Sequence, residues 1–215
     1  MSDEARKIRL IMELRRAGIT DTRVLAAIER VPREHFVPPQ LAEMAYDNVA
    51  LPIGHGQTIS QPFVVAYMTE KLAVGERMKV LEVGTGSGYQ AAVLSPLCRR
   101  LYTIERHRTL MREAEARFAR LDLRNVVTRV GDGYRGWPEQ APFDRIVVTA
   151  AAPEAPPALL DQLAVGGLMV LPLGDDLDQE LVRVRRDDDG YHSETLIGVR
   201  FVPLVAGAPA DDEGG

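Results

Sequence analysis

The sequence has very little cysteine, a single residue (Cys98) in a chain of 215. One thiol cannot form an intrachain disulfide framework, which excludes the class of small disulfide-stabilised domains. The chain also lacks any apolar run close to the ~20 residues of a membrane-spanning helix. Its first residues, MSDEARKIRL, are charged from the third position and contain no apolar signal-peptide core. We therefore expect a cytoplasmic protein with no membrane partner.

The chain also has no excess of positive charge. The formal net charge is −5 and the isoelectric point is near 5.5. Because nucleic-acid-binding proteins usually present a basic face, we expect no nucleic-acid partner. The four histidines and Cys98 show no metal-ligand spacing, so we also expect no metal. Hydrophobic residues make up 46% of the chain, which is typical of one globular domain, and we expect a monomer.

Hydrophobic spacing makes the first part of the chain helical. Residues 3–17 and 20–31 carry apolar residues at helical spacing, with Gly18 as the stop between them. We expect an extended, proline-rich connector at 32–40. A further helix is expected over 62–73, because the first turn of a helix tolerates the missing N–H of Pro62.

From residue 79 onward, expected strands alternate with expected helices. The strands cover 79–84, 100–105, 125–132, 143–151 and 166–174, and the helices cover 89–97, 109–121 and 156–163. This alternation predicts a mostly parallel sheet with helices on both faces. Residues 179–204 form two strands around an Asp-Gly turn, so we expect the sheet to end in an antiparallel hairpin.

A glycine-rich motif, VLEVGTGSGYQ, follows the first of these strands. A glycine turn at the carboxyl end of a strand lets the backbone approach a ligand closely. Seventeen residues beyond Gly88, Glu105 ends the second strand, where an acid binds the ribose hydroxyls of a nucleoside cofactor. The predicted cofactor-binding residues of these two strands are Glu82, Gly84, Thr85, Gly86, Ser87, Gly88 and Glu105.

Two cofactors compete for this site. A dinucleotide pyrophosphate favours the spacing G-x-G-x-x-G, whereas this chain has G-x-G-x-G with the carboxylate of Glu82 nearby. That carboxylate suits the sulfonium and ammonium groups of S-adenosylmethionine. After the third strand, Asp132 can accept a hydrogen bond from an adenine amino group, and Gly133 beside it is also predicted to bind the cofactor. We favour S-adenosylmethionine, with S-adenosylhomocysteine as product, over a nicotinamide or flavin dinucleotide, and disfavour a purely structural glycine turn.

An uncharged segment, GHGQTISQP at 54–62, lies between two apolar segments. A carboxylate that accepts a methyl group is already ionised at pH 7, so it requires positioning rather than a base. Hydroxyls and backbone N–H groups at a helix N-terminus can hold this carboxylate. A lysine or arginine would hold it too, but the positive charge would lower the nucleophilicity of the carboxylate. The segment therefore predicts carboxylate methylation. Two structural alternatives remain open: Ser60 as a helix cap, and Thr58 with Gln61 as a capping box.

GQTISQP, followed by LEVGTGSGYQ and then by RFVPL, resembles the protein-L-isoaspartate O-methyltransferase family over roughly residues 20–207. The resemblance implies a Rossmann-like class I methyltransferase, with a seven-stranded α/β domain and a helical N-terminal extension. The implied activity is methylation of the free α-carboxylate of L-isoaspartyl residues in damaged proteins and peptides. The ester then closes to a succinimide, whose hydrolysis returns some normal aspartate.

The resemblance also implies roles for single residues. Ser60 would be the catalytic residue that orients the acceptor carboxylate, and Gln57, Thr58, Ile59 and Val202 would contact the substrate. We expect one domain over 1–207, composed of the extension and substrate loop (1–60), the cofactor-binding core (61–178) and a hairpin (179–207), with a disordered tail at 208–215. The alternatives are a methyltransferase for a small-molecule or RNA acceptor, and an inactive cofactor-binding regulatory module.

Overall fold

The computed structural model describes residues 3–175 and 177–207. The strands of its large sheet are β3 (Lys79–Val83), β4 (Arg100–Glu105), β5 (Val126–Val130), β6 (Phe143–Val148), β7 (Leu163–Gly174), β8 (Gln179–Asp187) and β9 (Gly190–Val199). A separate hairpin consists of β1 (Leu51–Gly54) and β2 (Gln57–Ile59). The α-helices are α1 (Asp3–Arg16), α2 (Thr22–Arg30), α3 (Pro62–Leu72), α4 (Tyr89–Leu94), α5 (Arg108–Arg120) and α6 (Pro157–Asp161).

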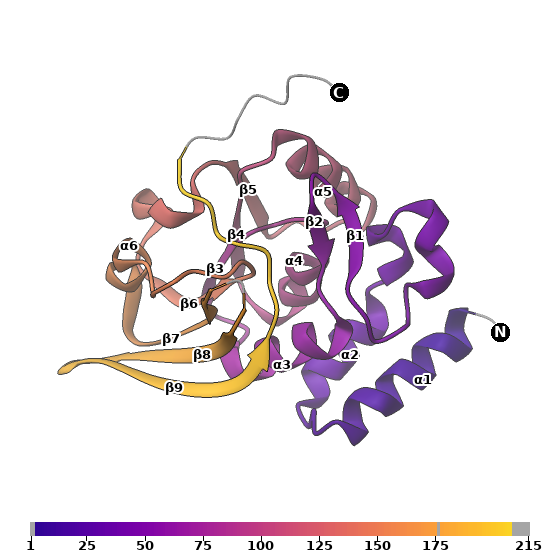
Figure 1. Cartoon of the computed structure of the whole chain (residues 1–215), viewed down its shortest axis with the longest axis horizontal. Coiled ribbons are helices and arrows are strands. Elements are labelled where there is room, and N and C mark those ends of the chain that lie inside the picture. The colour runs from indigo at the N-terminus through magenta and orange to yellow at the C-terminus, as the bar shows by residue number, and fades with distance from the viewer. Residues whose placement is uncertain (1–2, 176, 208–215) are drawn as a thin grey trace.

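The large sheet has the order β5-β4-β3-β6-β7-β8-β9 (Figure 1). Strands β3 to β7 run parallel to one another, whereas β8 pairs antiparallel with both β7 and β9. The predicted α/β fold, with a mostly parallel seven-stranded sheet that ends in an antiparallel hairpin, is confirmed. The predicted disordered tail, 208–215, lies outside the described residues.

Alternate strand residues are buried on opposite faces of the sheet. Val80 of β3 and Val147 of β6 belong to a core shared with α1 to α4. Their neighbours Leu81 and Ile146 belong to a second core that includes Leu159 of α6. Side chains alternate with a period of two along a strand, so apolar runs such as KVLEV and FDRIVV serve both faces. In Figure 1, α6 lies on one side of the sheet and α1 to α4 lie on the other.

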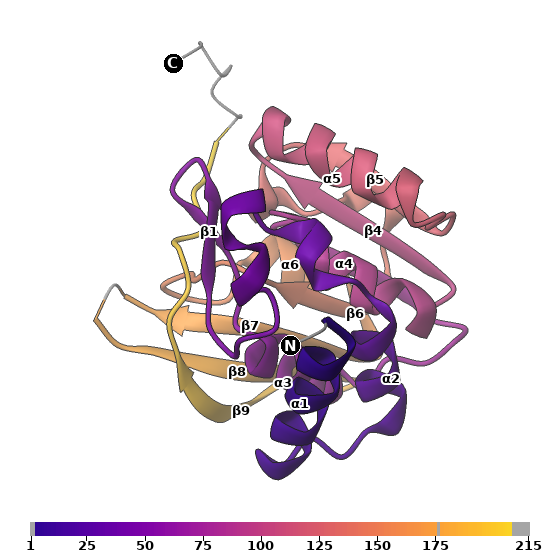
Figure 2. The ribbon, with the colours of Figure 1, turned by 90° about the vertical axis from the view of Figure 1, so that its right-hand side faces the viewer.

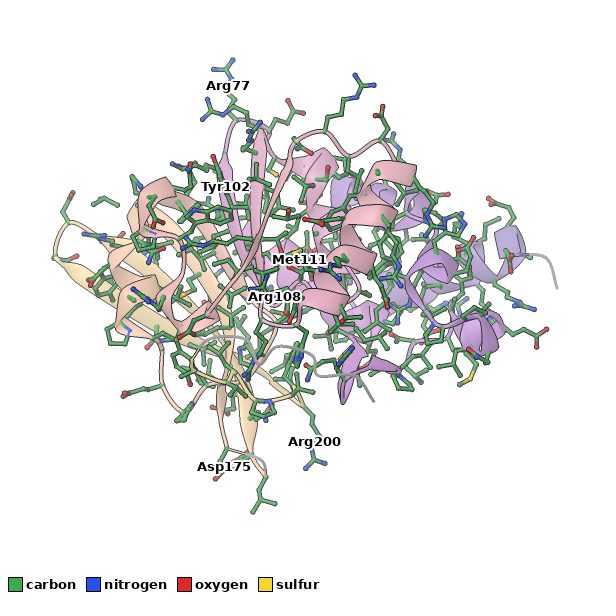
Figure 3. The ribbon with its side chains drawn as sticks, turned by 90° about the horizontal axis from the view of Figure 1, so that it is seen from above. Arg77, Tyr102, Arg108, Met111, Asp175 and Arg200 are labelled. Atoms are coloured by element: carbon green, nitrogen blue, oxygen red, sulfur yellow. The ribbon has the colours of Figure 1, made fainter. Side chains whose placement is uncertain are left out.

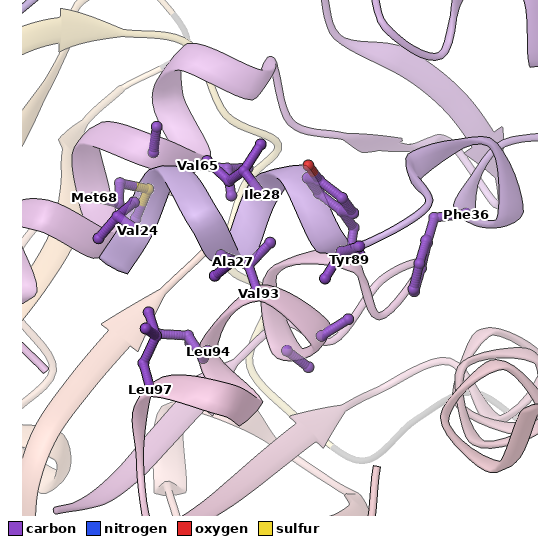
Figure 4. Packing of buried hydrophobic residues seen from close by; sticks show 14 of the residues in the cluster. Val24, Ala27, Ile28, Phe36, Val65, Met68, Tyr89, Val93, Leu94 and Leu97 are labelled. Atoms are coloured by element: carbon purple, nitrogen blue, oxygen red, sulfur yellow. The ribbon is translucent and has the colours of Figure 1, made fainter. Parts of the chain in front are cut away.

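The helical extension packs onto the sheet domain through α3 and α4. Figure 4 shows Val24 and Ile28 of α2 in one buried cluster with Met68 of α3 and Val93 of α4. Figure 2 shows α1 and α2 on the same flank of the molecule as α3 and β1. Burial of these side chains removes apolar surface from water and so stabilises the extension against the cofactor-binding core.

Two segments differ from their expected conformations. The connector expected to be extended contains two short 3₁₀-helices, η1 (Arg33–Phe36) and η2 (Pro39–Met44). Most of the uncharged segment, which belongs to the expected substrate loop, forms the turn and second strand of the hairpin β1–β2, with positive φ angles of 52° at His55 and 68° at Gly56. Consecutive positive φ angles form a tight hairpin turn. Its strands are too short for the period-two pattern to be detected in the sequence.

The parallel strands place their carboxyl ends at one edge of the molecule. Figure 3 shows Arg77, just before β3, at the opposite edge from Asp175 and Arg200, which follow β7 and β9. Ligands of open parallel sheets bind beyond the carboxyl ends of the strands. Among the described residues, no helix combines the length and the apolar character that crossing a bilayer requires.

Candidate active site

A cavity open to solvent, with about 850 Å³ of empty space including its mouth, lies at the carboxyl ends of β3 and β4. The predicted site residues that line it are Gln57, Thr58, Ile59, Ser60, Gly84, Thr85, Gly86, Ser87, Glu105, Gly133 and Val202. The uncharged segment and the glycine motif therefore meet at one cavity. The predicted residues Glu82, Gly88 and Asp132 are not part of its lining.

Close contacts require two glycines of the motif, Gly84 and Gly88. Gly84 has φ 97°, and a Cβ on it would lie 2.4 Å from Oγ1 of Thr149, the hydroxyl that donates a 2.6 Å hydrogen bond to the Gly84 carbonyl. Gly88 has φ 88°, and its Cβ would lie 2.7 Å from the Phe118 ring of α5. Gly84 thus shapes the cavity wall, whereas Gly88 lets α5 pack behind the glycine loop.

Glu105 lies where the sequence predicts a ribose-binding acid. Its Oε2 accepts a hydrogen bond from the Gly86 N–H at 2.8 Å, and its Oε1 accepts one from the His107 N–H at 3.0 Å. A carboxylate has about four acceptor positions, so these two bonds leave capacity for hydroxyl groups of a ligand. The carboxylate therefore connects the glycine loop to the end of β4 and still faces the cavity.

Glu82 occupies a different environment from the expected one. Its side chain is completely buried and accepts a hydrogen bond from Oγ1 of Thr103, which lies 2.6 Å from the hydroxyl of Thr85. Burial raises the pKa of the Glu82 carboxyl to about 8, although the bond from Thr103 lowers it. The carboxyl is thus mostly neutral at pH 7. The described contacts give Glu82 a supporting place behind Thr85 and leave no charge facing the cavity, and the predicted contact of Glu82 with the cofactor stays a prediction.

Asp132 also directs its carboxylate to the main chain. One oxygen accepts from the Tyr134 N–H and the other from the Gly207 N–H, each at 2.9 Å. The side chain thereby joins the 3₁₀ turn η4 (Gly133–Arg135) to the C-terminal segment. This arrangement places Gly133, rather than the Asp132 carboxylate, at the cavity.

Ser60 connects β2 to α3. The N-cap residue of α3, Gln61, makes no side-chain cap bond, and the Phe63 N–H in the first turn donates to Oδ1 of Asn48 instead. The capping alternatives for Ser60 and Thr58 therefore have no support in the structure. Ser60 lines the cavity and immediately precedes Gln61, the N-cap residue of α3.

Sequence reasoning missed several lining residues, including Gln90, Arg106, His107 and Thr149. Thr149 and His107 follow the ends of β6 and β4, so the rule that strand ends line the site could have found them. The ring of His107 lies 5.3 Å from that of His55, which brings the hairpin tip to the cavity rim. Gln90 lies within a helix and has no sequence signal of its own.

Among the described residues, one set of side chains could gather around a metal ion. Asp187, Asp189 and His192 hold their potential ligand atoms within 4.8 Å of one another at the turn between β8 and β9. None of the three lines the cavity, and Asp189 and His192 are exposed to solvent. Exposed acidic groups at a turn are common without an ion, so the expectation of no metal remains a prediction.

A family model described as protein-L-isoaspartate(D-aspartate) O-methyltransferase matches residues 5–208. The chain belongs to this family. Its relatives include protein-L-isoaspartate O-methyltransferases from Paramagnetospirillum magneticum, 64% identical over 97% of this chain and 98% of the relative, and from Rhodospirillum rubrum, 63% identical over the full length of both.

Solved structures of the protein-L-isoaspartate O-methyltransferase family share the fold. One is 29% identical with a TM-score of 0.83, covering 96% of this chain and 67% of the other. Another, from Plasmodium falciparum, is 26% identical with a TM-score of 0.80 and covers 92% of this chain and 97% of its own. That second structure was determined in complex with S-adenosyl-L-homocysteine. The likeness spans both the helical extension and the sheet domain.

Proposed function

We propose that this chain transfers a methyl group from S-adenosylmethionine to the free α-carboxylate of L-isoaspartyl residues in proteins and peptides. The observation that carries the proposal is the meeting of two elements at one cavity in a member of this family. The glycine loop and Glu105 form one side, and the uncharged segment 57–60 forms another. One side suits a nucleoside cofactor, and the other suits a carboxylate acceptor.

The residues of the cavity fit the chemistry of this cofactor. Glu105 retains acceptor capacity for a pair of ribose hydroxyls, and the glycine loop offers backbone that no Cβ shields. The cavity also contains a buried amide oxygen, Oε1 of Gln90, which has no donor among the described residues. When bound, the cofactor supplies a methyl group on a positively charged sulfur.

The acceptor requires orientation rather than deprotonation. An α-carboxylate has a pKa of roughly 3.3–3.7 in model peptides, so it is ionised at pH 7. In our proposal the Ser60 hydroxyl donates a hydrogen bond to one carboxylate oxygen and leaves the other in line with the methyl group. The N-terminal turn of α3 adds partial positive charge without a cationic side chain. Gln57, Thr58, Ile59 and Val202 border the isoaspartyl main chain.

Methylation makes the carboxyl group reactive toward its own backbone. An ionised carboxylate repels a nucleophile and would have to expel oxide, whereas a methyl ester can release methanol. The next backbone nitrogen therefore attacks the ester carbonyl and closes a succinimide ring, and its N–H proton leaves with the methoxide as methanol. Hydrolysis of that ring yields a mixture that contains normal aspartate. The chain thus initiates repair and needs no group for the later steps.

The test measures transfer of labelled methyl groups to an isoaspartyl peptide and to its aspartyl twin. We expect the isoaspartyl peptide alone to be labelled, and the label to leave as methanol at mildly alkaline pH, because carboxyl methyl esters are base-labile. A base-stable label on another acceptor would favour the small-molecule or RNA alternative. Cofactor binding without transfer to either peptide would favour the inactive regulatory module.

Three further properties belong to the same proposal. We infer that the chain acts as a monomer, works in the cytoplasm and needs no nucleic acid. The net charge of −5 supports the last of these, because it disfavours a polyanionic partner. Light scattering on the purified chain, cell fractionation, and an assay with and without nuclease treatment test the three in turn.

A further inference from the structure

The side chain of Gln90 is a buried polar group in the wall of the cavity. It belongs to the first turn of α4, directly after the glycine loop, and is only 7% exposed. Its Oε1 has no hydrogen-bond partner among the described residues. A buried amide oxygen without a donor costs free energy, and such atoms in a binding cavity are candidates for ligand contact.

A hydrogen-bond relay determines which amide atom of Gln90 is left without a partner. The Thr69 hydroxyl lies 2.7 Å from the carbonyl oxygen of Val65, which can only accept, so the hydroxyl proton is directed there. The Thr69 oxygen must then accept, and Nε2 of Gln90 donates to it at 2.9 Å. Rotating the amide by 180° would place its oxygen against the Thr69 oxygen with no proton between them. Oε1 is therefore the free atom, and it requires a donor.

The position of Gln90 in the fold indicates which group of the cofactor can donate a hydrogen bond to Oε1. Ribose hydroxyls belong at Glu105, which ends β4, and the adenine is expected beside Gly133, which follows β5. The sheet order β5-β4-β3 places both on one side of the glycine loop, whereas Gln90 and Thr69 lie on the side of α4 and α3. The amino-acid end of the cofactor is therefore expected on the side of α4 and α3, near Gln90. Its carboxylate offers only acceptors, and its ammonium offers three N–H donors.

We propose that Oε1 of Gln90 accepts a hydrogen bond from the α-ammonium of S-adenosylmethionine, with Thr69 holding the amide in the required orientation. This inference rests on the proposed function and assigns Gln90 as a cofactor-binding residue. It places a neutral acceptor at the cationic end of the ligand, where Glu82 was expected to supply a charge. Since Glu82 is enclosed behind Thr85, the amide at position 90 takes over that recognition.

The experiment compares two ligands by calorimetry. S-Adenosylhomocysteine carries the ammonium, and its deaminated analogue keeps the carboxylate but lacks the ammonium. In the wild-type chain we expect the deaminated analogue to bind more weakly by on the order of 10- to 100-fold, the range for a buried hydrogen bond to a charged group. In Gln90→Leu this difference should largely disappear, because both ligands then meet the same apolar side chain.

Variants of Thr69 supply the matched control. Valine has nearly the same shape as threonine but no hydroxyl, so in Thr69→Val the Gln90 amide is free to rotate. The ratio of the two dissociation constants should then lie between the wild-type value and the Gln90→Leu value. Thr69→Ser keeps the hydroxyl and should discriminate like the wild type. Thermal unfolding of each variant without ligand shows whether the fold is intact. If Gln90→Leu does not fold, the Thr69 pair still decides the inference.

The outcomes separate the inference from the proposed function. If folded Gln90→Leu discriminates between the two ligands as strongly as the wild type, the inference is overturned. The same holds if Thr69→Val matches Thr69→Ser. If the wild-type chain binds neither ligand, the assignment of the cofactor fails, and the proposed function fails with it.

Discussion

Asn48 accepts a hydrogen bond from the backbone N–H of Phe63, with 2.9 Å between Oδ1 and N. The bond joins residues 15 positions apart and satisfies a donor in the first turn of α3. The first N–H groups of a helix have no partner within the helix, so an external acceptor stabilises its start. Because Asn48 accepts from this N–H, Ser60, two residues before α3, is not needed as the acceptor for the Phe63 N–H.

Asn48→Ala should therefore destabilise the chain. Loss of a helix-capping acceptor costs about 1 kcal/mol, equivalent to a fall of roughly 2–4 °C in melting temperature for a chain of this size. Thermal unfolding followed by circular dichroism measures the change. The Asn48 amide also donates to Oε1 of Glu13 at 2.9 Å, so the control is Asn48→Asp in a Glu13→Gln background, which keeps the acceptor for Phe63 without setting two carboxylates against each other and should remain close to Glu13→Gln alone. An unaltered melting temperature in Asn48→Ala would show that this bond does not stabilise α3.

Ser60→Ala should lower turnover and leave stability intact. A positioned hydrogen bond to a charged group contributes about 1.5–3 kcal/mol, so turnover should fall on the order of 10- to 150-fold. The melting temperature should match the wild type, because the helix has its cap elsewhere. Affinity for S-adenosylhomocysteine should change little. Full turnover in a folded Ser60→Ala variant would remove Ser60 from the catalytic site.

Glu105→Ala should weaken cofactor binding by roughly 1.5–3 kcal/mol, the range for hydrogen bonds to a charged group. The substitution also frees the N–H groups of Gly86 and His107, so the glycine loop loses its tie to β4. Glu105→Gln keeps one carbonyl oxygen and should lose less. Calorimetric titration with S-adenosylhomocysteine compares the three chains. An unchanged dissociation constant in Glu105→Ala would exclude the ribose contact.

Glu82 should make the stability of the fold depend on pH. Burial raises the pKa of its carboxyl from 4.5 to about 8, so between those values only the folded chain keeps the proton. The unfolded chain then binds fewer protons than the folded one, and the free energy of unfolding falls as pH rises through this window. This contribution is fully present below 4.5 and lost above about 8.

Glu82→Gln tests this dependence, because the amide mimics the neutral acid and does not titrate. The free energy of unfolding of the variant should rise relative to that of the wild type as pH rises from about 5 to 8. Above this range the difference between the two chains should stay constant. Urea unfolding across this range measures it. A gap that stays constant with pH would mean that Glu82 is ionised in the folded chain.

Much of the architecture was predictable because it depends on local hydrophobic patterns. Alternating apolar runs and amphipathic segments predicted the sheet and its helices, and the positions of Gly84 and Glu105 predicted a nucleoside site at the strand ends. The same reasoning missed the hairpin β1–β2, whose strands of four and three residues are too short to show a period. It also missed the 3₁₀-helices of the connector, because single turns of this kind have no extended periodicity.

The fold class, the glycine loop and the uncharged segment at 54–62 are all encoded in residues close together in the chain, so local patterns were enough to predict them. Which polar side chains face the cavity depends on contacts between residues far apart in the chain. Glu82 and Glu105 are both acids of neighbouring strands, yet one is enclosed with Thr103 and the other reaches the ligand site. Gln90 gains its orientation from Thr69, 21 residues away on another helix. The direction of a polar group depends on partners that core packing brings together, and no local pattern specifies those partners.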